Sequence, residues 1–209
     1  VVFGVVLTYI SLILPLNKLA YVLIAGVLPL FVVQYKKWSN YLKTTNKSLI
    51  IIVSIVGVLV CFRASAFINN YDSGLYHVQS IKWIGEYSVI PGLGNLHGRL
   101  AFNPSIFTLS AAFSFASVFK QPVYAVNAFL LIMFFIYVIH VYLRFSQSNR
   151  AEHAFILLSG SLLLAYLMLM LDPASPDPDI AAMVITMYVF MRFLELLSEP
   201  KHSEIHSLS

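Results

Sequence analysis

Long apolar segments alternate with short polar stretches along the whole chain. The apolar segments span residues 1–16, 19–34, 48–68, 104–119, 123–143, 154–171 and 180–197. Several approach the ~20 residues that a helix needs to cross a bilayer, and backbone polar groups in hydrocarbon must be hydrogen-bonded within their own segment. The pattern therefore predicts an all-α, polytopic helical membrane protein, with one transmembrane domain over residues 1–198 and a polar tail or linker over residues 199–209.

The composition supports a membrane protein. Hydrophobic residues make up 59% of the chain, against about 45–50% in soluble domains. The chain starts at Val1 inside an apolar run and without an initiator Met, so we expect a fragment that lacks N-terminal residues and is also incomplete at its C-terminus. The one cysteine, Cys61, lies in an apolar run and excludes a disulfide framework.

The net charge of +4 is concentrated in one segment between two apolar runs. That segment, "QYKKWSNYLKTTNK", contains Lys36, Lys37, Lys43 and Lys47. A basic cluster can bind nucleic acid, but between two spans the positive-inside rule explains it better. We therefore expect this segment in the cytoplasm, the loop of residues 69–103 on the outer side, and no nucleic-acid partner.

One apolar segment is too short for a full crossing. Residues 105–119 would reach only about 22 Å as a helix, short of the ~30 Å hydrocarbon core, and they include several serines and a threonine. We expect this segment to enter the membrane and return. Arg144 and Arg150 then lie in the cytoplasm, as the positive-inside rule favours, and residues 172–179 lie on the outer side together with Asp72.

The outer loop opens with "NNYDSGLYHVQSIKW". Helical periodicity over residues 75–87 puts Tyr76, Ser80, Trp83, Ile84 and Tyr87 on one face, which is typical of a helix lying in the headgroup region. An Asp at position 72 suits the N-cap of this helix and still has lone pairs free for chemistry. His77 lies at the edge of the apolar face, either as a structural histidine or as a cavity-lining residue beside Asp72.

The rest of the loop, "VIPGLGNLHGRLAFNP", is rich in glycine. His97 and Arg99 flank its last glycine and present donors suited to a phosphate or pyrophosphate; the alternative is that Arg99 extends to lipid headgroups. Arg63, near the end of the preceding span, either extends outward in the same way or pairs with Asp72.

A second acidic motif, "LDPASPDPDIAAMV", stands at the start of the last span. Asp177 followed by Pro178 fits an N-cap with proline at the first helical position, and Asp179 suits the positive end of the helix dipole. Together with Asp172 these are more carboxylates than capping requires. Ionisable groups at a membrane boundary are candidates for function.

Two of these stretches resemble known membrane proteins. The outer loop with its acidic residue and interfacial helix, followed by "SPDPDIAAMVITMYVFMRF", resembles GT-C-type membrane glycosyltransferases over residues 48–198. The stretch "YDSGLYHVQSIKWI…PGLGNLHGRLAFNPS" looks closer to an uncharacterised family of bacterial polytopic membrane proteins. The chain has a single Asp where GT-C enzymes commonly have an acidic pair, and "FNPS" where they have His-Pro-Pro.

The resemblance implies a GT-C-like bundle in a bacterial inner (cytoplasmic) membrane, using a polyprenyl-phosphate-linked sugar on the outer face for cell-envelope glycan assembly. By position, Asp72 and Asp177 would be the catalytic acids, and a divalent cation is the cofactor that the resemblance raises. The residues that we expect to bind substrate are His77, His97, Arg99, Asp179 and Arg63.

Two other functions remain open at this point. One is a transporter or flippase for a lipid-linked or anionic solute, in which Asp72, Asp177 and Arg63 couple protons or ions. The other is a scaffold subunit whose acids serve only as helix caps.

Overall fold

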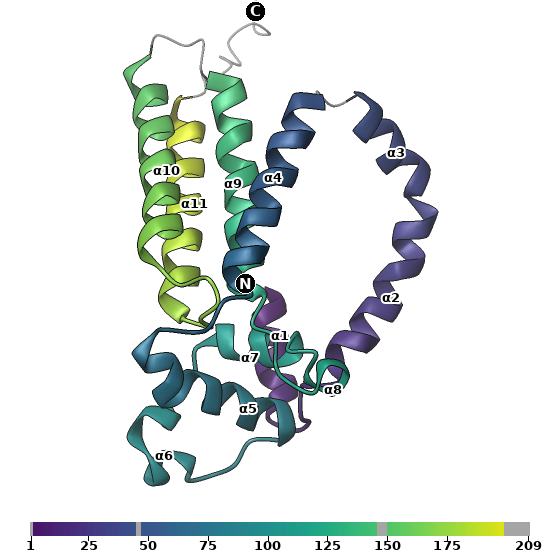
Figure 1. The fold of residues 1–209 in the computed structure, drawn as a ribbon, viewed down its shortest axis with the longest axis vertical. Helices are drawn as coiled ribbons and strands as arrows, with labels where there is room; N and C mark the ends of the chain where they lie inside the picture. The colour runs from purple at the N-terminus through teal and green to yellow at the C-terminus, as the bar shows by residue number, and fades with distance from the viewer. Residues whose placement is uncertain (1, 45–46, 146–149, 199–209) are drawn as a thin grey trace, which may run out of the picture.

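The computed structural model describes residues 2–44, 47–145 and 150–198, and every regular element in that part of the chain is helical (Figure 1). The predicted all-α class is therefore confirmed; the predicted tail, residues 199–209, lies outside the described residues. The α-helices are α1 (Val2–Ser11), α2 (Leu19–Val33), α3 (Tyr35–Thr44), α4 (Lys47–Ala64), α5 (Val78–Glu86), α6 (Leu93–Leu96), α7 (Ser105–Ala112), α8 (Ala116–Phe119), α9 (Val126–Phe145), α10 (Ala151–Met170) and α11 (Pro178–Ser198). Two short helices of other types are also present: the wider π-helix η1 (Ser73–His77) and the tighter 3₁₀-helix η2 (Gly98–Ala101).

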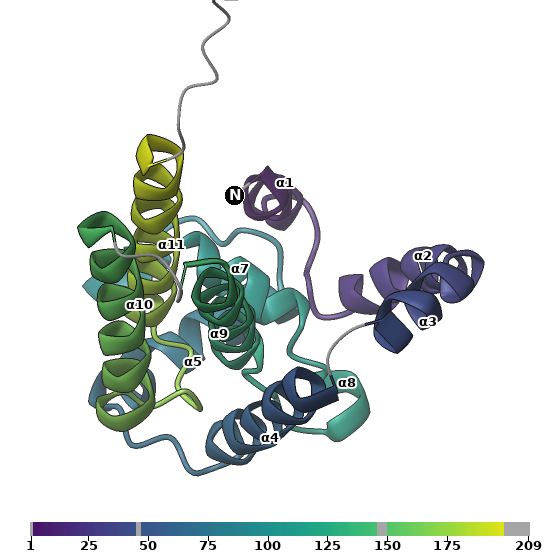
Figure 2. The same cartoon turned by 90° about the horizontal axis from the view of Figure 1, so that it is seen from above.

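The long helices form one layer of the molecule. Among the described residues, α4, α9 and α11 are long and apolar enough to cross a membrane, and α10 contains a shorter apolar stretch, His153–Leu167. Helices α9, α10 and α11 pack side by side, with α4 against α9 (Figures 1 and 2). Gly160 allows the close contact between α10 and α11, because a Cβ there would lie 2.7 Å from Cε of Met191. These features support the expected membrane protein.

A second layer of short helices lies at one end of the bundle (Figure 1). Helix α5 lies across that end and packs against α7, which in turn packs against α1. Buried Tyr76, Ile81 and Phe107 belong to the core of this layer. The orientation of α5 agrees with an interfacial helix, although its buried face is rotated from the predicted one: Ile81 and Gly85 are buried and Tyr87 is exposed.

The segment of residues 104–119 does not form one crossing helix. Helix α7 has eight residues, about 12 Å at 1.5 Å per residue, and the chain then reverses. Phe115 adopts a left-handed conformation with φ of 50°, and the N–H of Val123 donates to the carbonyl of Ser114 at 2.8 Å. This is the shape expected of a segment that enters and returns.

Helices α2 and α3 extend away from the bundle (Figures 1 and 2). The lysine-rich segment forms α3, and Lys36, Lys37 and Lys43 on it are exposed. The ends of α3, α9 and α11 lie at one end of the molecule and α5 lies at the other (Figure 1). The basic segments and the candidate site are thus at opposite ends, as the predicted topology requires.

Candidate functional site

Two segments about a hundred residues apart in sequence meet where the bundle joins the layer of short helices. The backbone N–H of Asn69 donates to Oδ2 of Asp172 at 2.9 Å, and Nδ2 of Asn70 donates to Oδ2 of Asp177 at 2.9 Å. The hydroxyls of Ser73 and Ser175 are 2.5 Å apart and are buried. These bonds bring the two acidic motifs together, as the sequence analysis expects of the outer side.

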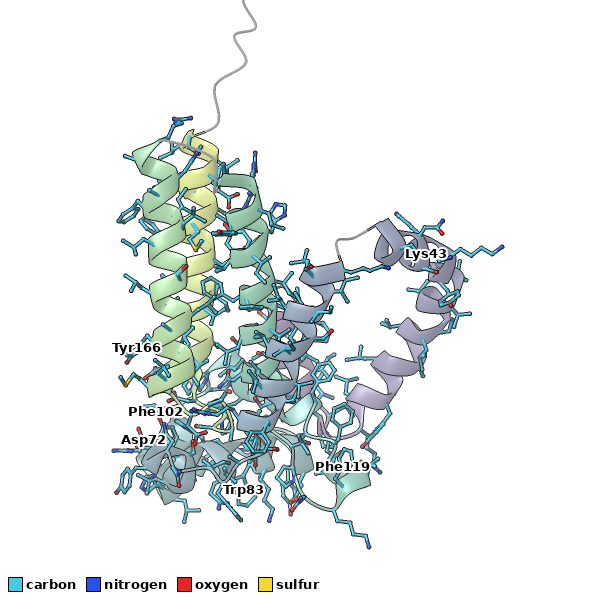
Figure 3. The ribbon with its side chains drawn as sticks, turned by 45° about the horizontal axis from the view of Figure 1, so that its top comes forward. Lys43, Asp72, Trp83, Phe102, Phe119 and Tyr166 are labelled. Atoms are coloured by element: carbon cyan, nitrogen blue, oxygen red, sulfur yellow. The ribbon has the colours of Figure 1, made fainter. Side chains whose placement is uncertain are left out.

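The most direct charge contact in the site joins Asp72 and Arg99. Nη1 of Arg99 lies 2.5 Å from Oδ1 of Asp72, and the two side chains are 42% and 45% exposed. The guanidinium carbon of Arg99 also lies 5.5 Å from the centroid of the Tyr76 ring, within the range of a cation–π contact. The predicted phosphate-binding arginine therefore contacts the predicted catalytic acid, which Figure 3 labels in the layer of short helices.

The capping role predicted for Asp72 is wrong. Its side chain makes no capping hydrogen bond, and its backbone is already helical, with φ of −67° and ψ of −27°. Asn70 takes the role instead, because its Oδ1 accepts from the N–H of Ser73 at 3.1 Å. The carboxylate of Asp72 is consequently free of the backbone and directed to Arg99.

His77 is buried in a turn that is wider than an α-helical one. The N–H of Val78 donates to the carbonyl of Ser73, five residues back, a π-type bulge of the kind often found at functional sites. The imidazole Nδ1 lies 3.1 Å from Oγ of Ser73, and the ring contacts Phe107 at 5.3 Å between centroids. Burial lowers the pKa of His77 below its usual 6.5, and the carboxylates of Asp177, Asp72 and Asp179 oppose that shift.

The same three carboxylates lie close enough to act on Tyr76. Burial is the main cause that raises the pKa of this phenol, and Asp72, Asp177 and Asp179 raise it further while Arg99 lowers it. The carboxylates of Asp72, Asp177 and Asp179 thus act on both Tyr76 and His77, and Arg99 contacts Asp72.

Asp177 does cap the last long helix. Its Oδ1 accepts from the N–H of Asp179 at 3.0 Å, and Pro178 is the first residue of α11. Its second oxygen accepts from Asn70, so this carboxylate both starts the helix and holds the first loop. Asp179 is exposed and makes no side-chain hydrogen bond or ion pair within the described residues.

Asn127 is a site residue that the sequence analysis missed. It lies in the first turn of α9, is 1% exposed, and donates from Nδ2 to the carbonyls of Ser175 and Asp177, each at 2.9 Å. Its Oδ1 has no hydrogen-bond partner among the described residues. The sequence feature that could have identified Asn127 is a single amide side chain at the start of an apolar run.

Two predicted site residues have other contacts. Nη2 of Arg63 donates to the carbonyl of Leu171 at 3.1 Å, so it supports the second loop and is not paired with Asp72. His97 is exposed, and its Nδ1 accepts from the N–H of Arg99 at 3.3 Å. It therefore caps η2, the turn that carries Arg99.

The described residues do not fit a protein-held metal centre. No three His, Cys, Asp or Glu side chains among them gather as a metal site would require. One oxygen of Asp72 faces Arg99, and both oxygens of Asp177 accept hydrogen bonds from protein groups. The described residues therefore do not fit the divalent cation that the resemblance raised.

A second polar cluster lies near the opposite end of the bundle, and the sequence analysis missed it too. Glu195 of α11 is fully buried; its Oε1 accepts from the hydroxyl of Tyr137 at 2.6 Å, and its Oε2 contacts Arg192 and, at 3.9 Å, Arg144. This network joins α9 to α11 and satisfies the buried charge.

Comparison with known proteins yields one family. The family model described as "Domain of unknown function (DUF8201)" matches residues 1–209. No curated protein and no solved structure matches the chain.

Proposed function

The chain belongs to the DUF8201 family over residues 1–209, and we propose that it is a membrane glycosyltransferase-like protein. Its substrate would be a sugar linked to polyprenyl phosphate, used at the outer face of a bacterial inner membrane for cell-envelope glycan assembly. The single observation that carries the proposal is the Asp72–Arg99 pair, half-exposed where the bundle meets the layer of short helices and close to the acidic motif of α11.

The pair offers the two groups that glycosyl transfer from a phosphate requires. A carboxylate takes the proton of the acceptor hydroxyl, a step worth typically 10²–10⁴-fold in rate. A guanidinium stabilises the charge that develops on the leaving phosphate and has the fork geometry that phosphate oxygens match.

The contact between Asp72 and Arg99 suggests an order of events. An arriving phosphate competes with Asp72 for the guanidinium, so that Arg99 turns to the phosphate and the carboxylate is released. The acceptor oxygen then forms its bond to the anomeric carbon while the bond from that carbon to the phosphate oxygen breaks. The hydroxyl proton passes to Asp72, and Arg99 stabilises the negative charge of the polyprenyl phosphate as it leaves.

The neighbouring residues support this pair rather than react. Burial lowers the pKa of His77, which suits a buried hydrogen-bonding residue that holds the Ser73–His77 turn. Asp177 holds the first loop through Asn70, and exposed Asp179 is placed to accept from an acceptor hydroxyl.

The location of the carboxylates favours the enzyme over a transporter. Asp72, Asp177 and Asp179 lie outside or at the first turn of the spanning helices, whereas coupling acids of transporters lie near the membrane midplane. Glu195, a buried carboxylate within a span, is satisfied by Tyr137 and two arginines.

The test uses the full-length protein in its native host. Asp72→Asn and Asp177→Asn are made separately, and membrane levels are measured. Lipid-linked sugars and surface glycans are then profiled by mass spectrometry. We expect Asp72→Asn to abolish one glycan modification and to cause its lipid-linked donor to accumulate.

A matched control lies in the same loop. Asp172 accepts from the N–H groups of Asn69 and Ala174 and has no role in the proposed chemistry, so Asp172→Asn should leave the glycan profile intact at equal membrane levels. Unchanged glycans in the Asp72 variant, at membrane levels equal to the parent, would exclude the transferase.

A further inference from the structure

A pocket of about 250 Å³ lies between α5, the glycine-rich turn, η2 and the end of α1. Residues that line it include Ser80, Trp83, Tyr87, Gly92, Phe102 and Asn103. Its volume is just below the ~300 Å³ at which pockets for drug-sized ligands begin. The size therefore suits a ligand of about one ring.

The chemistry of the walls is neutral. Among the described residues that line the pocket, none is Asp, Glu, Lys, Arg or His. The charged residues of α5, Lys82 and Glu86, do not line it. The lining combines aromatic faces with hydroxyls and an amide: the rings of Trp83 and Tyr87 are 5.2 Å apart between centroids, and Asn103 contributes a carboxamide. Such a surface suits a neutral molecule with an apolar face and several hydroxyls.

One wall residue has unused hydrogen-bonding capacity. Ser80 is 4% exposed, and its hydroxyl has no hydrogen-bond partner among the described residues. Buried hydroxyls are normally satisfied by protein, water or ligand. Ser80 therefore places an unsatisfied, enclosed hydroxyl at the pocket wall, which a ligand would reach after rotation of the side chain.

The pocket shares a wall with the ion pair. In η2, Leu100 and Ala101 line the pocket, while the preceding residue, Arg99, contacts Asp72. Phe102 lines the pocket and also meets the Tyr76 ring at 5.8 Å between centroids. Figure 3 shows Trp83 further along the same layer from Asp72 and Phe102. A molecule in the pocket would thus contact η2, the turn that carries Arg99.

We propose that this pocket binds one neutral saccharide ring, with its apolar face against Trp83 and its hydroxyls toward Ser80 and Asn103. The proposal rests on the proposed function, because that function identifies the ring as part of either the lipid-linked donor or the acceptor. The recognition itself is independent of catalysis by Asp72.

Direct binding tests the proposal. The chain contains two tryptophans, so a Trp38→Phe background leaves Trp83 as the fluorophore. The protein is placed in phospholipid nanodiscs, without sugar-based detergent, and titrated with methyl glucoside, methyl mannoside and methyl N-acetylglucosaminide. Methyl glucuronide serves as the anionic comparison. We expect saturable quenching by at least one neutral glycoside and weaker binding of the glucuronide.

Variants are read out by ligand-observed NMR, which does not need the Trp83 fluorescence. Trp83→Ala should weaken binding roughly five- to tenfold, as loss of an aromatic contact predicts, and Trp83→Phe should retain most of it. Asn103→Ala alters an exposed wall residue with little risk to folding and should also weaken binding. Lys82→Ala is the matched control, because Lys82 lies on the same helix but lines a different pocket.

The outcomes separate this proposal from the proposed function. If no neutral glycoside binds, or if Trp83→Ala and Asn103→Ala bind as the parent does, the pocket proposal is overturned even when Asp72→Asn alters glycans. If glycosides bind while Asp72→Asn leaves glycans unchanged, the pocket proposal stands and the transferase fails. Competition by a polyprenyl-phosphate-linked sugar assigns the ring to the donor; simultaneous binding assigns it to the acceptor.

Discussion

Replacement of Asn127 by Ala should loosen the second acidic loop while the bundle stays folded. The variant removes the donor for two carbonyls, those of fully buried Ser175 and half-buried Asp177. An unsatisfied buried group costs about 1–3 kcal/mol, and the more accessible carbonyl costs less because water can reach it. Removing the amide also removes its own unpartnered Oδ1, which offsets part of the cost.

The net loss of local stability is therefore about 1–3 kcal/mol, or roughly 5- to 150-fold in the opening equilibrium. Hydrogen–deuterium exchange read by mass spectrometry measures it on peptides that cover residues 171–179. We expect exchange there to accelerate within that range, with α9 and α10 unchanged. Asn69→Ala is the control, because Asn69 uses only its backbone N–H to hold the loop. Exchange that stays within about twofold of the parent in the Asn127 variant would refute the hydrogen-bond argument.

Three further predictions concern single side chains. Arg99→Gln should abolish the glycan modification yet change the free energy of unfolding by less than about 1 kcal/mol, because half-exposed ion pairs contribute little; a large loss of thermal stability would contradict this. Burial lowers the pKa of His77 below 6.5, so the stability that depends on its neutral form is intact above about pH 6.5 and is lost as the pH falls through the lower folded-state pKa. His77→Gln should therefore flatten the fall in melting temperature between about pH 7 and pH 5. Two tyrosines on α9 and just before it make a contrasting pair. Tyr137→Phe loses a hydrogen bond to a buried carboxylate and should cost about 1.5–3 kcal/mol, while Tyr124→Phe removes a hydroxyl without a partner among the described residues and should be neutral or stabilising. Equal melting temperatures for the two tyrosine variants would count against the assignment of these hydrogen bonds.

Much of the fold follows from the lengths of the apolar segments. The apolar run of residues 48–68 corresponds to α4, 123–143 to α9, 154–171 to α10 and 180–197 to α11, with ends that differ by a few residues. These boundaries are predictable because a spanning helix must satisfy its own backbone. The reversal near Phe115 is also predictable from the sequence, since a short apolar segment that contains several serines does not suit a full membrane crossing.

Local capping was less predictable. Asp72 satisfied the pattern of an acid just before an amphipathic run, but Asn70 lies two residues earlier and suits the same role. The choice between them depends on the π-type turn at Ser73–His77, which starts the helical winding earlier than α-helical periodicity suggests. No short-range pattern in the sequence predicts the additional residue that a π-helical turn contains.

The contacts between distant segments could not be predicted from single residues. Arg63 was a reasonable partner for Asp72 by charge, yet it donates to the carbonyl of Leu171, because neutral backbone acceptors carry no signal in a sequence. Glu195 was likewise hidden, since one acid near the end of a span suggests a membrane boundary rather than a buried network. Both outcomes depend on which helices pack together.

The sequence separation of the site's hydrogen bonds has a consequence for biosynthesis. Ser73 and Asn70 bond to Ser175 and Asp177, which follow 102 and 107 residues later. At about 5–20 residues per second of translation, the first motif waits roughly 5–20 s for its partners. During that interval Asn70 and Ser73 lack these partners, so a chain interrupted before α11 has the loop of residues 69–103 without the contacts that hold it to the second acidic motif.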